Sequence, residues 1–503
     1  MKTKMKNPKK ENLKVVTPSE SELKRLLQNY QNGLYIDAEK LARSITQEFP
    51  KHQFAWKVLG ALLKNTGRVS ESLVAFQKAV TLSPQDASAH LNLGIIFKEL
   101  VRLNDAEVSY RQAIALKPNY VEAHNNLGNT LEELGRLDDA ETSYKLAIFS
   151  KPDFAEAHNN LGVTLEKLSK LDNAEVSYRQ AIALKPNYVE AHNNLGITLE
   201  GLGRLDDAEA SYRQAIALKP DYAEAHNNLG NVLRVRRKYE EAIYHFDMLN
   251  NDFGTALSLE CLYISKNYDE FYKRLNSLSV LDKMNLRVAA VSSFAAHQMK
   301  KKDPYPFCKN PIDFITINNL ADYDFYSNTL LDEIIKEADG YQLTWESRTT
   351  KFGFQGLANV FENPSKTISL LERIVQQAVD AYYESFKSES NLFIKSWPRN
   401  HKLVGWYNRL VKNGHHTSHI HQTGWLSGVI YLKTINLSNN DEGAIEFGLH
   451  GYDLPITDKE YPRKLHRPKR GDIVLFPSSL FHRTVPFTTD SERCVIAFDL
   501  KTI

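Results

Sequence analysis

The chain has 503 residues, of which 42% are hydrophobic and 25% charged, and its formal net charge at pH 7 is +2. A chain of this length exceeds one ordinary hydrophobic core, so we expect two or more domains. The composition is that of a soluble globular protein. The small net charge produces no field that would attract nucleic acid or an anionic membrane, and we expect neither as a partner.

Cysteine usage and the N-terminal segment bear on the cellular compartment. Cys261, Cys308 and Cys494 lie far apart, a spacing that indicates neither a disulfide framework nor a cysteine zinc site. The basic segment 1–14 lacks the apolar stretch of a signal peptide, and no apolar run is long enough to span a bilayer. We therefore expect a cytoplasmic protein, whose oligomeric state these features leave open.

The first half of the chain is repetitive. Prolines recur every 34 residues at Pro50, Pro84, Pro118, Pro152, Pro186 and Pro220, and glycines recur with the same step at Gly60, Gly94, Gly128, Gly162, Gly196 and Gly230. This period resembles the tetratricopeptide repeat, a helix–turn–helix unit whose copies stack into a superhelix with a concave groove. We expect a disordered segment 1–18, repeats over 19–252 and a helical cap and linker over 253–300.

Asparagine recurs once per clear repeat, at Asn92, Asn126, Asn160, Asn194 and Asn228. Asparagine is a poor helix former, so its repetition inside helices needs a reason. The pattern resembles the asparagine ladder of O-linked N-acetylglucosamine transferases, which implies that these amides hold a protein or peptide in the groove. The alternative is a hydrogen-bond ladder between repeats. His124 and its equivalents in the other repeats, five histidines in all, are interpreted as helix packing.

The second half, 301–503, changes character. Helices are predicted at 328–340 and 364–385, and short strands at 403–410, 425–433, 443–447, 472–477 and 493–500. Several short strands without intervening helices indicate an antiparallel barrel or jelly roll. The predicted fold class is therefore multidomain α+β, with an all-α repeat array followed by a β-rich domain with flanking helices.

Histidines cluster in this domain. His415, His416, His419 and His421 fall within seven residues, and His482 follows about sixty residues later. Residues two apart on a strand point to one face, so His419 and His421 could meet His482 at one metal. Nitrogen ligands suit Fe(II), zinc or copper. A dense histidine run can also be a solvated loop, and we expect His415 and His416 to be loop residues.

The segment from about 404 to 500 resembles the double-stranded β-helix of the Fe(II)/2-oxoglutarate oxygenases. The closest likeness is to a family with the motifs His-x-His, Leu-Ser-Gly-Val-x-Tyr-Leu and Phe-Pro-Ser-x-Leu-x-His, which stand here at 419–421, 426–432 and 476–482. The resemblance implies a double-stranded β-helix, or jelly roll, that uses Fe(II), 2-oxoglutarate and O2.

The resemblance also implies roles for single residues. His419 and His482 take the places of two metal-binding histidines, and Arg493 that of the base that clamps the far carboxylate of 2-oxoglutarate. Tyr431, and Ser427 on the same strand face, are assigned to cosubstrate binding. His421 stands where the superfamily has a carboxylate ligand.

Three roles are open for His421. It can be a third metal ligand, a neighbour of a two-histidine site, or the first ligand in place of His419. We predict that His419, His421 and His482 hold the metal together. The predicted function is an Fe(II)- and 2-oxoglutarate-dependent dioxygenase that hydroxylates a protein or peptide recruited by the repeats. The alternative is a repeat scaffold for protein–protein interaction with a catalytically degenerate barrel.

Overall fold

The structure is a computed structural model, and it describes residues 17–281, 284–305, 307–345, 350–356, 358–435 and 441–503. Residues 1–16 of the segment predicted to be disordered lie outside this description. The chain divides into two compact units, Met1–Val232 and Leu233–Ile503. Because the division falls inside one helix, the domain limits proposed from the sequence, 19–252, 253–300 and 301–503, remain predictions.

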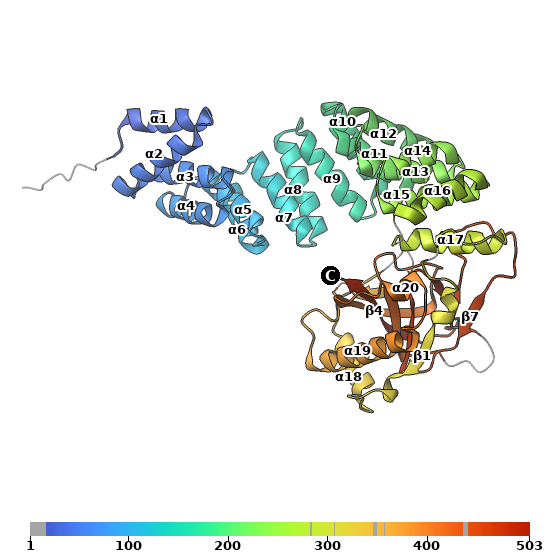
Figure 1. The fold of residues 1–503 in the computed structure, drawn as a ribbon. Coiled ribbons are helices and arrows are strands. Elements are labelled where there is room, and N and C mark those ends of the chain that lie inside the picture. Colours follow the sequence, from blue (N-terminus) through green and yellow to red (C-terminus); the bar gives the residue numbers. More distant parts are fainter. Residues whose placement is uncertain (1–16, 282–283, 306, 346–349, 357, 436–440) are drawn as a thin grey trace, which may run out of the picture. The chain divides into compact units, whose positions relative to one another are not determined.

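The first unit consists of helices stacked in pairs, with one pair for each repeat (Figure 1). The helices are α1 (Glu20–Gln31), α2 (Tyr35–Glu48), α3 (Gln53–Asn65), α4 (Val69–Leu82), α5 (Ala87–Glu99), α6 (Leu103–Leu116), α7 (Val121–Glu133), α8 (Leu137–Ser150), α9 (Ala155–Lys167), α10 (Leu171–Leu184), α11 (Val189–Gly201), α12 (Leu205–Leu218) and α13 (Ala223–Val235).

In the five helix pairs from α3–α4 to α11–α12, an aromatic ring of the second helix packs on a glycine of the first. A Cβ atom added at Gly128 would lie 2.6 Å from the ring of Tyr144, and one added at Gly196 would lie 2.5 Å from the ring of Tyr212. Both rings are fully buried. Glycine therefore recurs with the period of the repeat because the aromatic ring of the second helix packs directly on the backbone of the first. A residue with a side chain in place of the glycine would prevent this contact.

The repeat histidines have a structural role. Each one hydrogen-bonds through Nε2 to the carbonyl of the proline six residues before it, at 2.8 to 3.0 Å; the histidines are His90, His124, His158, His192 and His226. These bonds satisfy carbonyl groups in the turns that follow the preceding helices. The interpretation of these five histidines as packing residues is confirmed.

The second unit begins with helices and continues into β structure. Its helices are α14 (Tyr239–Asp247), α15 (Asp252–Ile264), α16 (Tyr268–Leu281), α17 (Leu286–Gln298), α18 (Leu330–Ala338), α19 (Lys366–Phe386) and α20 (Leu392–Lys395), with short 3-10 turns at Pro311–Phe314 and Leu320–Asp322. One buried hydrophobic cluster runs through α15, α17, α19 and the strands. The helices expected as a cap thus share a core with the β-rich part.

Two antiparallel sheets form the rest of this unit (Figure 1). The strands are β1 (Thr316–Asn319), β2 (Leu343–Trp345), β3 (Thr350–Gly356), β4 (His401–His416), β5 (Leu426–Lys433), β6 (Ile445–Gly448), β7 (Arg463–His466), β8 (Asp472–Pro477), β9 (Phe481–Thr484) and β10 (Arg493–Thr502). The larger sheet has the order β1-β8-β5-β10-β4-β3-β2, and the smaller one β7-β6-β9.

The predicted fold class, an α-helical repeat array followed by an antiparallel β-rich domain, is confirmed. The five predicted strands correspond to β4, β5, β6, β8 and β10, and the two predicted helices to α18 and α19. The narrower assignment to a double-stranded β-helix stays a prediction. In the part of the chain that the structure describes, no helix is both long and apolar enough to cross a membrane.

Candidate metal centre

The His-x-His motif lies in the loop that follows β4, so its expected position on a strand is wrong. His419 forms an isolated bridge with His482 of β9. The two backbone bonds of this bridge run from His419 N to His482 O at 3.1 Å and from His482 N to His419 O at 3.0 Å. Main-chain pairing, and not alternation along one strand, therefore brings the distant histidines together.

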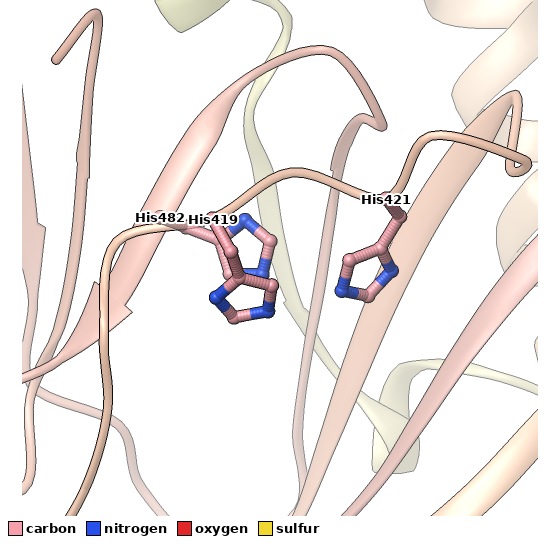
Figure 2. A group of neighbouring side chains, drawn as sticks. All are labelled: His419, His421 and His482. Atoms are coloured by element: carbon pink, nitrogen blue, oxygen red, sulfur yellow. The ribbon is translucent and has the colours of Figure 1, made fainter. Parts of the chain in front are cut away.

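The three predicted ligands form a compact group (Figure 2). One ligand atom from each of His419, His421 and His482 can be chosen so that all three lie within 4.8 Å of one another. The ring centroids of His419 and His482 are 4.4 Å apart, and those of His421 and His482 are 5.0 Å apart. The separations are small enough for side-chain rotation to gather the rings around one ion.

The hydrogen bonds of the rings leave one nitrogen of each histidine available. Nδ1 of His419 bonds to the carbonyl of Thr417 at 2.7 Å, and Nδ1 of His482 bonds to the carbonyl of Leu480 at 3.2 Å. Nδ1 of His421 lies 2.6 Å from a carboxylate oxygen. Donation from Nδ1 selects the tautomer with an unprotonated Nε2, which is the form that binds a metal. The donor set therefore fits a three-histidine site.

Burial keeps the imidazoles of His419 and His482 neutral. Burial first, and then the neighbouring His421, lower the pKa of His419 from 6.5 to about 4. Burial and the imidazoles of His419 and His421 hold the pKa of His482 well below its ordinary value. At neutral pH, protons therefore do not compete with a metal for these nitrogens.

The lowered pKa of His419 predicts that the metal-free protein loses stability in mild acid. Between pH 6.5 and about 4, His419 is protonated in the unfolded chain but not in the folded chain. The free energy of unfolding therefore falls as the pH falls. The full loss from this residue is about 3 kcal/mol. Urea unfolding at several pH values measures it, and His419→Gln should flatten the profile. Equal stability of the wild type at pH 7 and pH 5 would contradict the prediction.

The three histidines line a cavity of about 300 Å³, which Arg493 of β10 also faces. Arg493 is only 2% exposed. Its Nη2 donates to the hydroxyl of Tyr431 at 3.3 Å, and its buried Nε has no hydrogen-bond partner. Within the described residues Arg493 forms no ion pair with a carboxylate. A buried cation without a countercharge is costly, so the cavity fits an anionic ligand.

Tyr431 and Ser427 were assigned to the cosubstrate, but neither lines this cavity. Tyr431 is fully buried on β5 and lies behind Arg493, whose guanidinium is 5.0 Å from its ring. The Ser427 hydroxyl donates to Asp499 at 2.8 Å. The geometry therefore supports a role for Tyr431 in orienting Arg493. Ser427 instead contacts Asp499, the residue that bonds to Nδ1 of His421.

Sequence reasoning missed two residues. His416, expected in a loop, is a strand residue because β4 extends to it, paired with Thr350 of β3; the same extension places His415 in the strand. His416 lines the cavity, and its Nδ1 lies 3.0 Å from the Thr484 hydroxyl. Asp499, the partner of His421, was also missed. Its signal was a single acidic residue inside the otherwise apolar run 494–500.

The asparagines of the repeats bond across repeat boundaries. Asn160 donates from Nδ2 to Oδ1 of Asn125 and of Asn129, each at 3.2 Å. Asn194 donates to Asn159 at 3.3 Å, and Asn228 donates to Asn193 at 3.2 Å. These bonds form the hydrogen-bond ladder between repeats that was the alternative to peptide binding. The amides are nevertheless only partly buried, as are Asn92 and Asn126, so a peptide can still reach them.

Residues 405–499 match the family model described as "Putative 2OG-Fe(II) oxygenase". Residues 102–135, 121–154, 155–188 and 193–250 match models of the tetratricopeptide repeat. The chain is a fusion of tetratricopeptide repeats with a domain of this oxygenase family. The two halves recognised from their motifs are thereby confirmed, and the oxygenase match includes all three clustered histidines.

Several solved structures resemble part of the chain. MamA is 23% identical, with 33% of this chain and 97% of MamA covered and a TM-score of 0.31. YrrB, described as a TPR protein with an unusual peptide-binding site, is 20% identical over 37% of this chain and 95% of its own, with a TM-score of 0.33. PilF of Pseudomonas aeruginosa is 19% identical over 44% and 100%, with a TM-score of 0.35. No curated protein matches significantly.

Proposed function

We propose that this oxygenase–repeat fusion is an Fe(II)- and 2-oxoglutarate-dependent dioxygenase that hydroxylates a protein or peptide. The observation that carries the proposal is the pairing of two features in one cavity. Three imidazoles offer Nε2 atoms to a metal, and the buried Arg493 beside them has no carboxylate partner among the residues that the structure describes. A metal-chelating dicarboxylate such as 2-oxoglutarate satisfies both.

The residues of the cavity divide the work. His419, His421 and His482 would hold Fe(II), which together with 2-oxoglutarate and O2 supplies the oxidising chemistry. Arg493 would bind the far carboxylate through two parallel hydrogen bonds, a geometry that a guanidinium favours. Apolar side chains at Val429 and Val495 line the same space and exclude water from it.

The test is turnover of 2-oxoglutarate without the unknown substrate. Purified protein with Fe(II), ascorbate and air should convert 2-oxoglutarate slowly to succinate, and removal of Fe(II) by a chelator should stop the reaction. The control is the same protein incubated without Fe(II). Absence of succinate from iron-loaded, folded protein would reject the oxygenase and leave the scaffold as the function.

We further propose that the repeats bind an extended segment of the substrate through Asn126, Asn160 and Asn194. An amide offers both a donor and an acceptor to a peptide unit, whatever the side chain. Because Asn160 and Asn194 also bond between repeats, their replacement should affect both binding and stability.

Changing the three asparagines to alanine is expected to weaken substrate capture by about 1 kcal/mol each and to lower the free energy of unfolding by a similar amount per lost bond. Binding of a confirmed protein substrate and urea unfolding measure the two effects. Asn119→Ala with Asn187→Ala, at exposed turn positions, is the matched control. Lower stability with unchanged capture would make the ladder structural only.

A further inference from the structure

Asp499 lies at the centre of a buried hydrogen-bond network beneath His421. It is 4% exposed and stands on β10. Its Oδ1 accepts from His421 Nδ1 at 2.6 Å and from Ser427 Oγ at 2.8 Å. Ser427 Oγ also lies 2.8 Å from Ser478 Oγ. The Ser427 hydroxyl, which is itself held by Ser478, and the His421 imidazole therefore fix the carboxylate in one orientation.

The turn after His421 is shaped around this carboxylate. A Cβ atom added at Gly424 would lie 2.7 Å from Ser478 Oγ and 2.8 Å from Asp499 Cγ, closer than real Cβ contacts. The backbone can approach the network only because Gly424 lacks a side chain. Main-chain bonding from His421 N to Ser478 O at 3.0 Å holds the same turn.

Asp499 has no lysine or arginine partner within the described residues; its recorded ion-pair contact is with His421. A buried carboxylate needs a compensating positive charge. His421 lines the cavity, and it can pass on to Asp499 the charge of a metal bound at its Nε2. The other two histidines of the group donate Nδ1 to backbone carbonyls instead. Only the histidine at the position of the usual carboxylate ligand has an acidic partner.

We infer that Asp499 is a positioning residue that holds His421 as a metal ligand. Through the imidazole of His421, Asp499 would supply the site with the negative charge that a directly bound carboxylate would otherwise bring. The inference rests on the proposed metal-dependent function. A carboxylate on Nδ1 fixes the ring and makes Nε2 a stronger donor. Of the three roles open for His421, the bond to Asp499 favours that of a metal ligand, because it fixes the ring through Nδ1 and leaves Nε2 for the metal.

The test measures metal affinity by anaerobic titration with Fe(II), and with Co(II) followed by its visible absorption. Asp499→Ala is expected to weaken binding about 10- to 100-fold. Asp499→Asn keeps an oxygen acceptor and loses the charge, so its affinity should fall between that of the wild type and that of the alanine variant. In a His421→Ala background, Asp499→Asn should cause no further loss, because the two residues act through one bond.

The chain offers a matched control in Asp472→Asn. Asp472 Oδ2 bonds to His466 Nε2 at 3.0 Å, and neither residue lines the cavity, so this variant should bind metal like the wild type. Thermal melting verifies the fold of each variant. If Asp499→Ala does not fold, Asp499→Asn decides the question.

A folded Asp499→Asn protein with wild-type affinity for Fe(II) and Co(II) overturns the inference. If the wild type still turns over 2-oxoglutarate in that case, only the role of Asp499 fails. If metal binding depends on Asp499 but no succinate forms, the proposed oxygenase fails and the role of Asp499 stands.

Discussion

His482→Ala is expected to abolish stoichiometric binding of Fe(II) and, with it, the formation of succinate. His482 is 6% exposed and supplies one of the three clustered imidazoles. Its loss leaves two histidines on a single short segment, which hold a metal weakly because the ion's remaining positions are open to water. The backbone bridge to His419 does not involve the imidazole, so the fold should survive.

Iron per chain, measured after anaerobic reconstitution and desalting, provides the readout, with circular dichroism to verify folding. His466→Ala is the control, since His466 bonds to Asp472 and lies outside the cavity. Full retention of iron by His482→Ala would show that the metal is bound elsewhere. His419→Ala should behave like His482→Ala.

Arg493→Ala is expected to raise the half-saturating concentration of 2-oxoglutarate by about 30-fold or more while iron stays bound. Removing one partner of a buried, hydrogen-bonded charge pair costs about 2 kcal/mol or more. Arg493→Lys keeps the charge and loses the planar fork, so its effect should be smaller. Initial rates of succinate formation against 2-oxoglutarate concentration give the values.

Arg483 provides the comparison for Arg493. It follows the distal histidine directly, but its guanidinium is exposed and pairs with Glu446 at 3.0 Å. Arg483→Ala should leave the dependence on 2-oxoglutarate unchanged. Arg409 of β4 is a second comparison, because it pairs with Cys494 next to Arg493 and its buried Nε also has no hydrogen-bond partner in the described part of the chain. If Arg493→Ala has no effect and Arg483→Ala or Arg409→Ala has one, the carboxylate clamp is at that other arginine.

Local pattern was sufficient for the repeats and for the long strands. The 34-residue period reflects a contact made within a repeat, such as that of Gly128 with Tyr144. Because the two residues are close in sequence, the local pattern is enough to predict the repeat. Strands β5, β8 and β10 are mostly apolar and almost entirely buried, and that composition predicts them. The strands β1, β2, β3, β7 and β9 were not predicted, since most are short and none has a distinctive pattern.

The sequence by itself determined the repeat array, the β-rich domain and the identity of the three clustered histidines. Only the tertiary structure decided which residues bond to these histidines. The bond between His421 and Asp499 joins residues 78 apart in sequence, and the bridge between His419 and His482 replaces the expected strand. Both depend on how β10, β9 and the turn at Gly424 pack, and strand parity cannot be followed through such a turn. Hydrogen bonds between distant segments arise from that packing, which no local pattern encodes.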